Sequence, residues 1–128
     1  VNKASAPIAV VDDEPPVRTM LKRALRLADY EVAEFAGGEE FLTALPTLRP
    51  ACVILDVRMP VLSGFDVARR MREMNFRVPL ILITASDDAA IDRSAAEAGA
   101  VRVLRKPFST DALLAAVRVA LGAELLGT

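Results

Sequence analysis

The sequence predicts a doubly wound α/β domain, in which helices cover both faces of a parallel β-sheet. Short apolar runs alternate with stretches of helical periodicity five times along the chain. Three of the apolar runs are continuous Val, Ile and Leu segments, as in strands that are buried on both faces of a parallel sheet. The chain has 128 residues, 53% of them hydrophobic, which suits one domain with a sizeable core. Strict alternation of strands and helices implies parallel strands joined by right-handed crossovers.

Five segments are predicted to be strands. They are Ile8–Val11, Glu31–Phe35, Cys52–Leu55, Pro79–Thr84 and Val101–Leu104. Glu31 and Glu34 interrupt the second strand, and Arg102 lies in the fifth. These two strands are therefore expected at the edges of the sheet, where strands are more polar.

The first two helices are predicted from apolar spacing and from prolines. Apolar residues recur at helical spacing over Pro15–Ala28, and the two prolines of this segment fall in its first turn, where a missing N–H costs little. The second helix is expected over Gly38–Leu45 and is predicted to stop near Pro46.

The other three helices follow the third, fourth and fifth strands. They are predicted at about Phe65–Met74, Ala89–Ala98 and Ser109–Leu121. Gly99 is a typical residue just after a helix, and Ser109 is a good N-cap. Residues 1–128 are thus read as one domain with a core at about 8–121, and the segments 1–7 and 122–128 are expected to be tails or a linker.

The composition excludes several classes of function. Sixteen basic and seventeen acidic residues leave a net charge of −1 without a basic block, so the domain itself is not expected to bind nucleic acid. Histidine is absent, which excludes imidazole metal ligands, Ser-His-Asp catalysis and a phosphohistidine relay within the chain. The only cysteine, Cys52, cannot form an internal disulfide, which favours a reducing, cytoplasmic compartment. No apolar run is long enough to cross a membrane.

Polar side chains follow four of the predicted strands. They are Asp12 and Asp13 after the first strand, Asp56 after the third, Thr84 at the end of the fourth and Lys106 just after the fifth. Ligands of open parallel sheets bind beyond the carboxyl ends of the strands, near the point where the strand order reverses. These residues are therefore expected in one cleft.

The chain resembles the receiver domains of two-component response regulators. The resemblance extends from about Ile8 to Leu121. Four motifs carry it, each at the C-terminal end of its own predicted strand: "VVDDE", "VILDVRMPVLSG", "LILITA" and "GAVRVLRKPFS". The resemblance implies a flavodoxin-like (βα)5 fold with a five-stranded parallel sheet in the order 2-1-3-4-5. It also implies a cis peptide bond between Lys106 and Pro107.

The same resemblance implies roles for the cleft residues. Asp56 would accept a phosphoryl group, Asp12 and Asp13 would form a magnesium site, and Lys106 and Thr84 would contact the phosphoryl group. The function implied is a phosphorylation-dependent signalling switch that is phosphorylated by a sensor histidine kinase. The domain would be a regulator that assists only its own phosphorylation and dephosphorylation, not an enzyme. It could control an attached helix-turn-helix output and form a homodimer through the fourth helix, the fifth strand and the fifth helix.

The chemistry of the residues supports a magnesium site independently. Adjacent carboxylates repel one another and lose hydration when they are partly buried, so they favour a cation. Mg²⁺ prefers oxygen ligands and needs only one or two carboxylates besides water and phosphate oxygens. Asp13 and Asp56 are expected to be direct ligands, Asp12 a ligand through water, and the backbone carbonyl near Arg58 a further ligand. Mg²⁺ and Lys106 together would balance the three aspartates.

One residue departs from the family pattern. Val103 stands three residues before Lys106, where receiver domains generally have an aromatic side chain that turns inward on phosphorylation. A β-branched side chain has little rotameric freedom. We therefore expect the switch to act mainly through the loop and helix at Ala85–Ala98, or through a changed dimer face.

The same residues also allow other interpretations. The acidic residues before Pro15 could simply favour the positive end of a helix, Asp56 could be an N-cap, and Lys106 could be an ordinary surface lysine. A degenerate receiver that binds partners without phosphorylation is the alternative function. A magnesium-dependent phosphatase is less favoured because no D-x-D pair occurs on one of these loops, and an FMN carrier because no Ser/Thr/Gly-rich loop follows the first strand.

Overall fold

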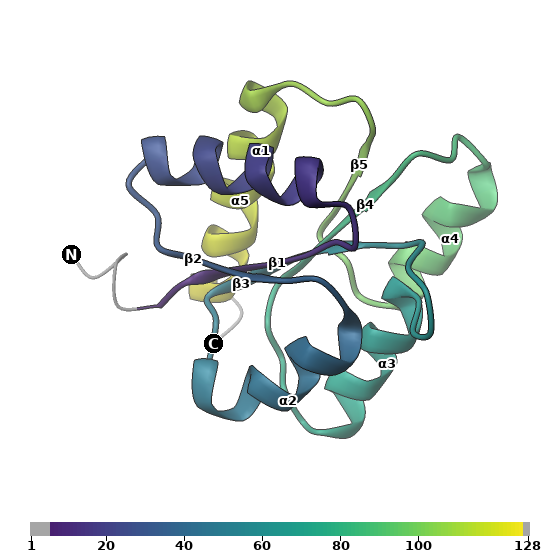
Figure 1. The fold of residues 1–128 in the computed structure, drawn as a ribbon. Coiled ribbons are helices and arrows are strands. Elements are labelled where there is room, and N and C mark those ends of the chain that lie inside the picture. The colour runs from purple at the N-terminus through teal and green to yellow at the C-terminus, as the bar shows by residue number, and fades with distance from the viewer. Residues whose placement is uncertain (1–5, 127–128) are drawn as a thin grey trace.

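The computed structural model describes residues 6–126, with side chains up to residue 122, as a parallel sheet between two layers of helices (Figure 1). The elements alternate as β1 (Ile8–Val11), α1 (Pro15–Leu27), β2 (Val32–Phe35), α2 (Gly38–Leu48), β3 (Cys52–Asp56), α3 (Gly64–Glu73), β4 (Leu80–Thr84), α4 (Ala89–Glu97), β5 (Arg102–Arg105) and α5 (Thr110–Leu126). The five strands are all parallel and lie in the order β2-β1-β3-β4-β5. The predicted fold class and strand order are confirmed.

Two hydrophobic layers hold the helices against the sheet. One layer joins the sheet to α1 and α5 through buried residues that include Leu21, Leu25, Leu113 and Val117. The other joins it to α2, α3 and α4 through buried residues that include Phe41, Leu45, Val67, Met71 and Ala95. The side chains of a strand alternate between the two faces of the sheet, and helices cover both faces. β1, β3 and β4 are therefore buried along their whole length.

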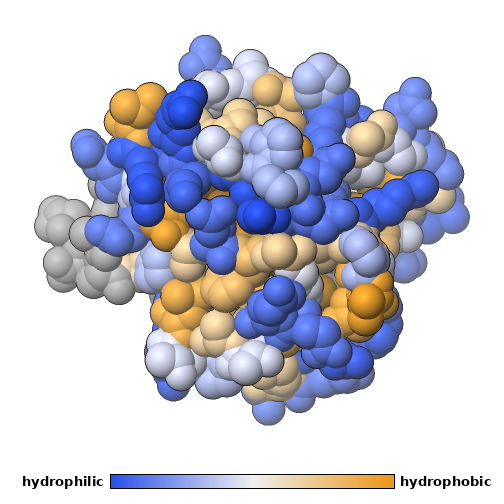
Figure 2. Space-filling view, viewed as in Figure 1, coloured by the Kyte–Doolittle hydropathy of each residue, from blue (hydrophilic) through white to orange (hydrophobic). Residues whose placement is uncertain are grey.

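The two edge strands are more exposed, as their sequences predict. β2 and β5 each contain partly or fully exposed residues at three or more of their four positions. β2 reaches the surface between α1 and α2 (Figure 1). In Figure 2 a band of hydrophobic residues crosses this region, below the hydrophilic surface over α1. The order of the sheet therefore agrees with the polarity of its strands.

The second helix begins at Gly38 as predicted but ends at Leu48, three residues later than the predicted end at Leu45. α2 continues through Pro46 to Leu48 and ends at Arg49, which has left-handed backbone angles and donates its N–H to the carbonyl of Leu45 at 3.1 Å. A proline removes one helical hydrogen bond, here near the end of the helix. Leu45, directly before Pro46, is fully buried, and Leu48, in the part of the helix after Pro46, packs partly buried against the same hydrophobic layer. Their burial outweighs the local cost of the proline.

The fifth helix begins as predicted and runs further than predicted. The Ser109 hydroxyl accepts a hydrogen bond from the N–H of Ala112 at 3.0 Å, which is the expected N-cap interaction. The helix continues to Leu126 instead of ending near Leu121, so residues 122–126 belong to α5. The outer parts of the two expected tails, residues 1–5 and 127–128, lie outside the described residues. Within residues 6–126 no helix is long and apolar enough to cross a membrane.

Candidate functional site

A polar cavity lies at the carboxyl ends of the strands, where the sequence predicts it. Its volume is about 360 Å³, and its lining residues come from the ends of β1, β3, β4 and β5: Asp13, Glu14, Asp56, Arg58, Thr84, Ala85, Ser86 and Lys106. The fully buried Asp12 adjoins it through an ion pair with Lys106. Segments that are far apart in the sequence therefore meet here because parallel strands end at the same edge of the sheet.

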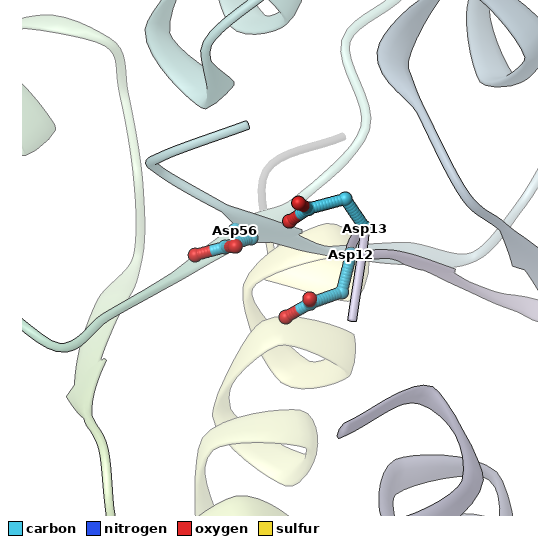
Figure 3. Close-up of side chains that lie close together, drawn as sticks. All are labelled: Asp12, Asp13 and Asp56. Atoms are coloured by element: carbon cyan, nitrogen blue, oxygen red, sulfur yellow. The ribbon is translucent and has the colours of Figure 1, made fainter. Parts of the chain in front are cut away.

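Three carboxylates converge at this edge. Asp12 and Asp13 follow β1, Asp56 ends the neighbouring β3, and their side chains point to one side of the strand ends (Figure 3). One oxygen from each lies within 4.8 Å of the others. Asp12 is fully buried and Asp56 is 4% exposed, whereas Asp13 reaches solvent. The group is therefore open to ligands from one side only.

The turn after β3 fixes the position of Asp56. The N–H of Val57 continues the sheet by donating to the carbonyl of Ile83 at 2.9 Å, and the N–H of Gly64 returns to the carbonyl of Val57 at 2.8 Å. A Cβ atom at Gly64 would overlap the backbone carbonyl oxygen of Asp56. Gly64 thus permits a close approach between the start of α3 and the strand that carries Asp56.

Lys106 brings a positive charge into the carboxylate group. Its backbone N–H donates to the carbonyl of Thr84 at 2.8 Å, and the Lys106–Pro107 peptide bond is cis, as predicted. Its Nζ lies 3.1 Å from Glu14 Oε1, 3.3 Å from Asp12 Oδ2 and 3.7 Å from Asp56 Oδ1. Glu14 is a partner that the sequence interpretation missed, although it directly follows the two aspartates.

Burial and mutual repulsion dominate the electrostatics of the pocket. Burial, followed by repulsion from Asp12, raises the pKa of Asp56 to about 6 although Lys106 opposes the rise. Burial also raises the pKa of Asp12, against the hydrogen bond from the N–H of Glu14 and the attraction of Lys106. Partial burial opposes the charge of Lys106, but Asp56 and the other carboxylates outweigh it and raise the pKa of Lys106. Lys106 alone therefore does not offset the energetic cost of holding Asp12 and Asp56 as buried, adjacent carboxylates.

This cost predicts the pH dependence of the metal-free protein. The folded-state pKa of Asp56 is about 6 against an ordinary 3.8, so the folded state binds the proton more tightly. Stability should therefore fall as the pH rises from about 4 to above 6, by about 3 kcal/mol at most. Urea unfolding in EDTA at several pH values measures this fall. The fall should be smaller in Asp56→Asn, and an equal fall in both proteins would contradict the assignment.

The residues fit a hard divalent cation. Asp12 Oδ1 accepts a hydrogen bond from the N–H of Glu14 at 2.8 Å, whereas the buried Asp12 Oδ2 has, among the described residues, the ion pair with Lys106 at 3.3 Å. Three carboxylate oxygens in one small volume form the kind of donor set that Mg²⁺ prefers. Arg58 lines the cavity, and ligation by its carbonyl stays a prediction.

Thr84 ends β4, the strand next to the one that carries Asp56, and lines the same cavity. It is 3% exposed, and its hydroxyl oxygen accepts a hydrogen bond from the N–H of Ser86 at 3.1 Å. The hydroxyl proton is thus available to a further acceptor in the cavity. Val103 is partly buried against the hydrophobic layer of α2, α3 and α4. The sequence interpretation singled out Val103 but missed Arg105, which lies two residues later on the same face of β5.

The doubly wound sheet, with three aspartates and a lysine at the C-terminal ends of its strands, defines a small α/β domain whose polar pocket suits a divalent cation. The family model of the response regulator receiver domain matches residues 8–118. The chain therefore belongs to the receiver domain family of response regulators.

Individual relatives agree with this family. The chain is 36% identical over 121 residues to response regulator protein TmoT of Ectopseudomonas mendocina, covering 94% of this chain and 55% of TmoT. It is 37% identical over 114 residues to transcriptional regulatory protein FixJ of Bradyrhizobium diazoefficiens, covering 89% of this chain and 56% of FixJ. The chain thus spans little more than half the length of these two relatives.

Solved structures share the fold. The crystal structure of FixJ-N is similar with a TM-score of 0.86 and 32% identity, covering 91% of this chain and 94% of that one. The chemotaxis protein CheY4 of Vibrio cholerae is similar with a TM-score of 0.85 and 30% identity, covering 91% of this chain and 98% of that one. Both comparisons therefore extend over nearly the whole domain.

Proposed function

We propose that this receiver domain is a phosphorylation-dependent switch that accepts a phosphoryl group on Asp56, with Mg²⁺ bound at Asp12, Asp13 and Asp56. One observation carries the proposal: Asp56 lines an open cavity together with two further carboxylates and with Lys106, whose Nζ lies 3.7 Å from Asp56 Oδ1. An oxygen nucleophile, a cation and acidic ligands in one small cavity are what phosphoryl transfer requires.

The residues divide the chemistry among them. A carboxylate oxygen of Asp56 attacks the phosphorus, an O–P bond forms, and the donor atom leaves with the electron pair of its own bond to phosphorus. Bound Mg²⁺ would share the negative charge of the phosphoryl oxygens and of the aspartates. Lys106 can pair with a phosphoryl oxygen through Nζ, and Thr84 can donate its hydroxyl proton to another. The product on Asp56 is an acyl phosphate, which water can hydrolyse.

The donor and the output lie outside this domain. We propose that the phosphohistidine of a sensor histidine kinase supplies the phosphoryl group, which membership of the receiver domain family supports. The name of FixJ, a transcriptional regulatory protein, supports an output in transcription. A cytoplasmic location and a homodimer through α4, β5 and α5 are part of the same proposal. The domain would act as a regulator of its partner or output and would turn over no other substrate.

Incubation with acetyl phosphate tests the acceptor function. We expect the protein to gain the mass of one phosphoryl group when Mg²⁺ is present and to gain none in EDTA, because the three aspartates need a cation before an anionic donor can approach. Intact-protein mass spectrometry measures the gain. Equal mass in both samples after full incubation would contradict the proposal.

A further inference from the structure

Arg105 joins the last residue of β5 to the segment that follows β4. Its Nε donates to the carbonyl of Ser86 at 3.1 Å, and one terminal nitrogen donates to the carbonyl of Asp88 at 3.3 Å. Its two terminal nitrogens bind the two carboxylate oxygens of Asp92, on α4, at 3.1 and 3.2 Å. One guanidinium therefore holds both the β4–α4 loop and the first turns of α4.

The β4–α4 loop is also hydrogen-bonded to Thr84, which lines the acceptor cavity. Thr84 is the register partner of Arg105 in the sheet, and its hydroxyl oxygen accepts the N–H of Ser86 at 3.1 Å. The N–H of Ser86 thus donates a hydrogen bond to Thr84, and the carbonyl of Ser86 accepts one from Arg105. The Ser86 hydroxyl also accepts the N–H of Asp88 at 3.1 Å, and the Asp88 side chain caps α4 through the N–H of Ala90 at 2.9 Å. A continuous chain of hydrogen bonds therefore connects Thr84, at the cavity, with the start of α4.

The geometry of Arg105 makes this connection specific. A single exposed ion pair stabilises a protein little, and the Asp92 side chain is 58% exposed. A guanidinium with a bidentate carboxylate and two backbone carbonyls is different, because its planar donors fix the direction of every partner. Val103, on the same face of β5, is stiff at its first side-chain torsion. Arg105 is thus the side chain on this face with hydrogen bonds to both the loop and the helix.

We propose that Arg105 is the positioning residue that couples phosphorylation of Asp56 to α4. The inference rests on the proposed function of Asp56. When the Thr84 hydroxyl turns toward a phosphoryl oxygen, the N–H of Ser86 moves with it or loses its acceptor. The carbonyl of Ser86 belongs to the same residue and is bound to Arg105, so its displacement changes the contacts of Arg105 with Asp88 and Asp92. Arg105 then binds the start of α4 differently in the unphosphorylated and the phosphorylated domain.

Hydrogen exchange with and without a phosphoryl mimic tests the coupling. Amides 85–97 are followed in the wild type, Arg105→Gln and Asp92→Asn, each with Mg²⁺ alone and with Mg²⁺ plus beryllofluoride. Arg102→Gln is the matched control, because Arg102 is an exposed arginine on β5 whose described hydrogen bond goes to its neighbour, the carbonyl of Val101. Intact mass after acetyl phosphate treatment shows whether each variant still accepts the phosphoryl group.

We expect beryllofluoride to change exchange of these amides in the wild type and in Arg102→Gln. In Arg105→Gln, exchange without the mimic should be about fivefold faster, and the further change on adding the mimic should be lost although the mass gain is kept. Asp92→Asn should lose part of the change. A purely structural brace would speed exchange by the same factor with and without the mimic, and that result would overturn the proposal. A wild type that neither gains mass nor responds to the mimic would contradict the proposed function itself.

Discussion

Asp56→Asn is expected to abolish phosphorylation of the domain by acetyl phosphate. Asparagine has nearly the same shape as aspartate, so the cavity keeps its form, but its neutral amide oxygen is a far weaker nucleophile than a carboxylate. The other carboxylates of the group cannot replace it under this account, because Asp12 is fully buried and Asp13 follows a different strand. Intact mass after incubation with Mg²⁺ and donor measures the loss, which should be complete.

Asp29→Asn is the matched control for this substitution. Asp29 is exposed, lies beyond the end of α1 at the opposite edge of the sheet, and has a φ of 70°, which asparagine tolerates well. It should gain mass like the wild type. A phosphoryl mass on Asp56→Asn would show that another residue accepts the group.

Lys106→Ala should slow phosphorylation and remove the conformational response. Lys106 is the cation in contact with Asp12, Glu14 and Asp56, so its loss leaves three carboxylates without their described positive partner. Loss of one preorganised charge at a phosphoryl group lowers the rate by on the order of tenfold to hundredfold. The acceptor itself remains, so a slow mass gain should persist. Stopped incubations give the rate, and hydrogen exchange of amides 85–97 gives the response.

A surface lysine supplies the comparison. Lys22 pairs with Glu34, away from the cavity, at an N–O distance of 2.5 Å. Lys22→Ala should leave both the rate and the exchange response close to those of the wild type. If Lys106→Ala were phosphorylated and responded as Lys22→Ala does, the role given to Lys106 would be wrong.

Much of the site could be predicted because its residues sit at strand ends. Asp12, Asp13, Asp56 and Thr84 each end or follow a strand whose continuous apolar run is visible in the sequence, and Lys106 follows the last strand. Parallel strands place these ends at one edge whatever the details of the helices. The location of the cavity therefore depended on the fold class and on little else.

The errors arose where packing outweighs a local signal. Pro46 is a strong local stop signal, but the packing of Leu45 and Leu48 against the core carries α2 past it. The hydrogen bonds of Arg105 depend on the path of the β4–α4 loop, which the sequence pattern does not define. The contact of Glu14 with Lys106 likewise depends on side-chain positions across 92 residues of sequence. Periodicity predicts which face a residue occupies, but it does not predict which polar partner lies opposite.

Chemical trapping of the acyl phosphate identifies the phosphorylated residue directly. The wild-type domain is phosphorylated with acetyl phosphate and Mg²⁺ and then treated with borohydride, which reduces an aspartyl phosphate to homoserine while phosphate leaves. Peptide sequencing by tandem mass spectrometry then locates the change. We expect homoserine at position 56 and at no other aspartate. Homoserine elsewhere, or a phosphoryl group that survives borohydride on a hydroxyl side chain, would contradict this expectation.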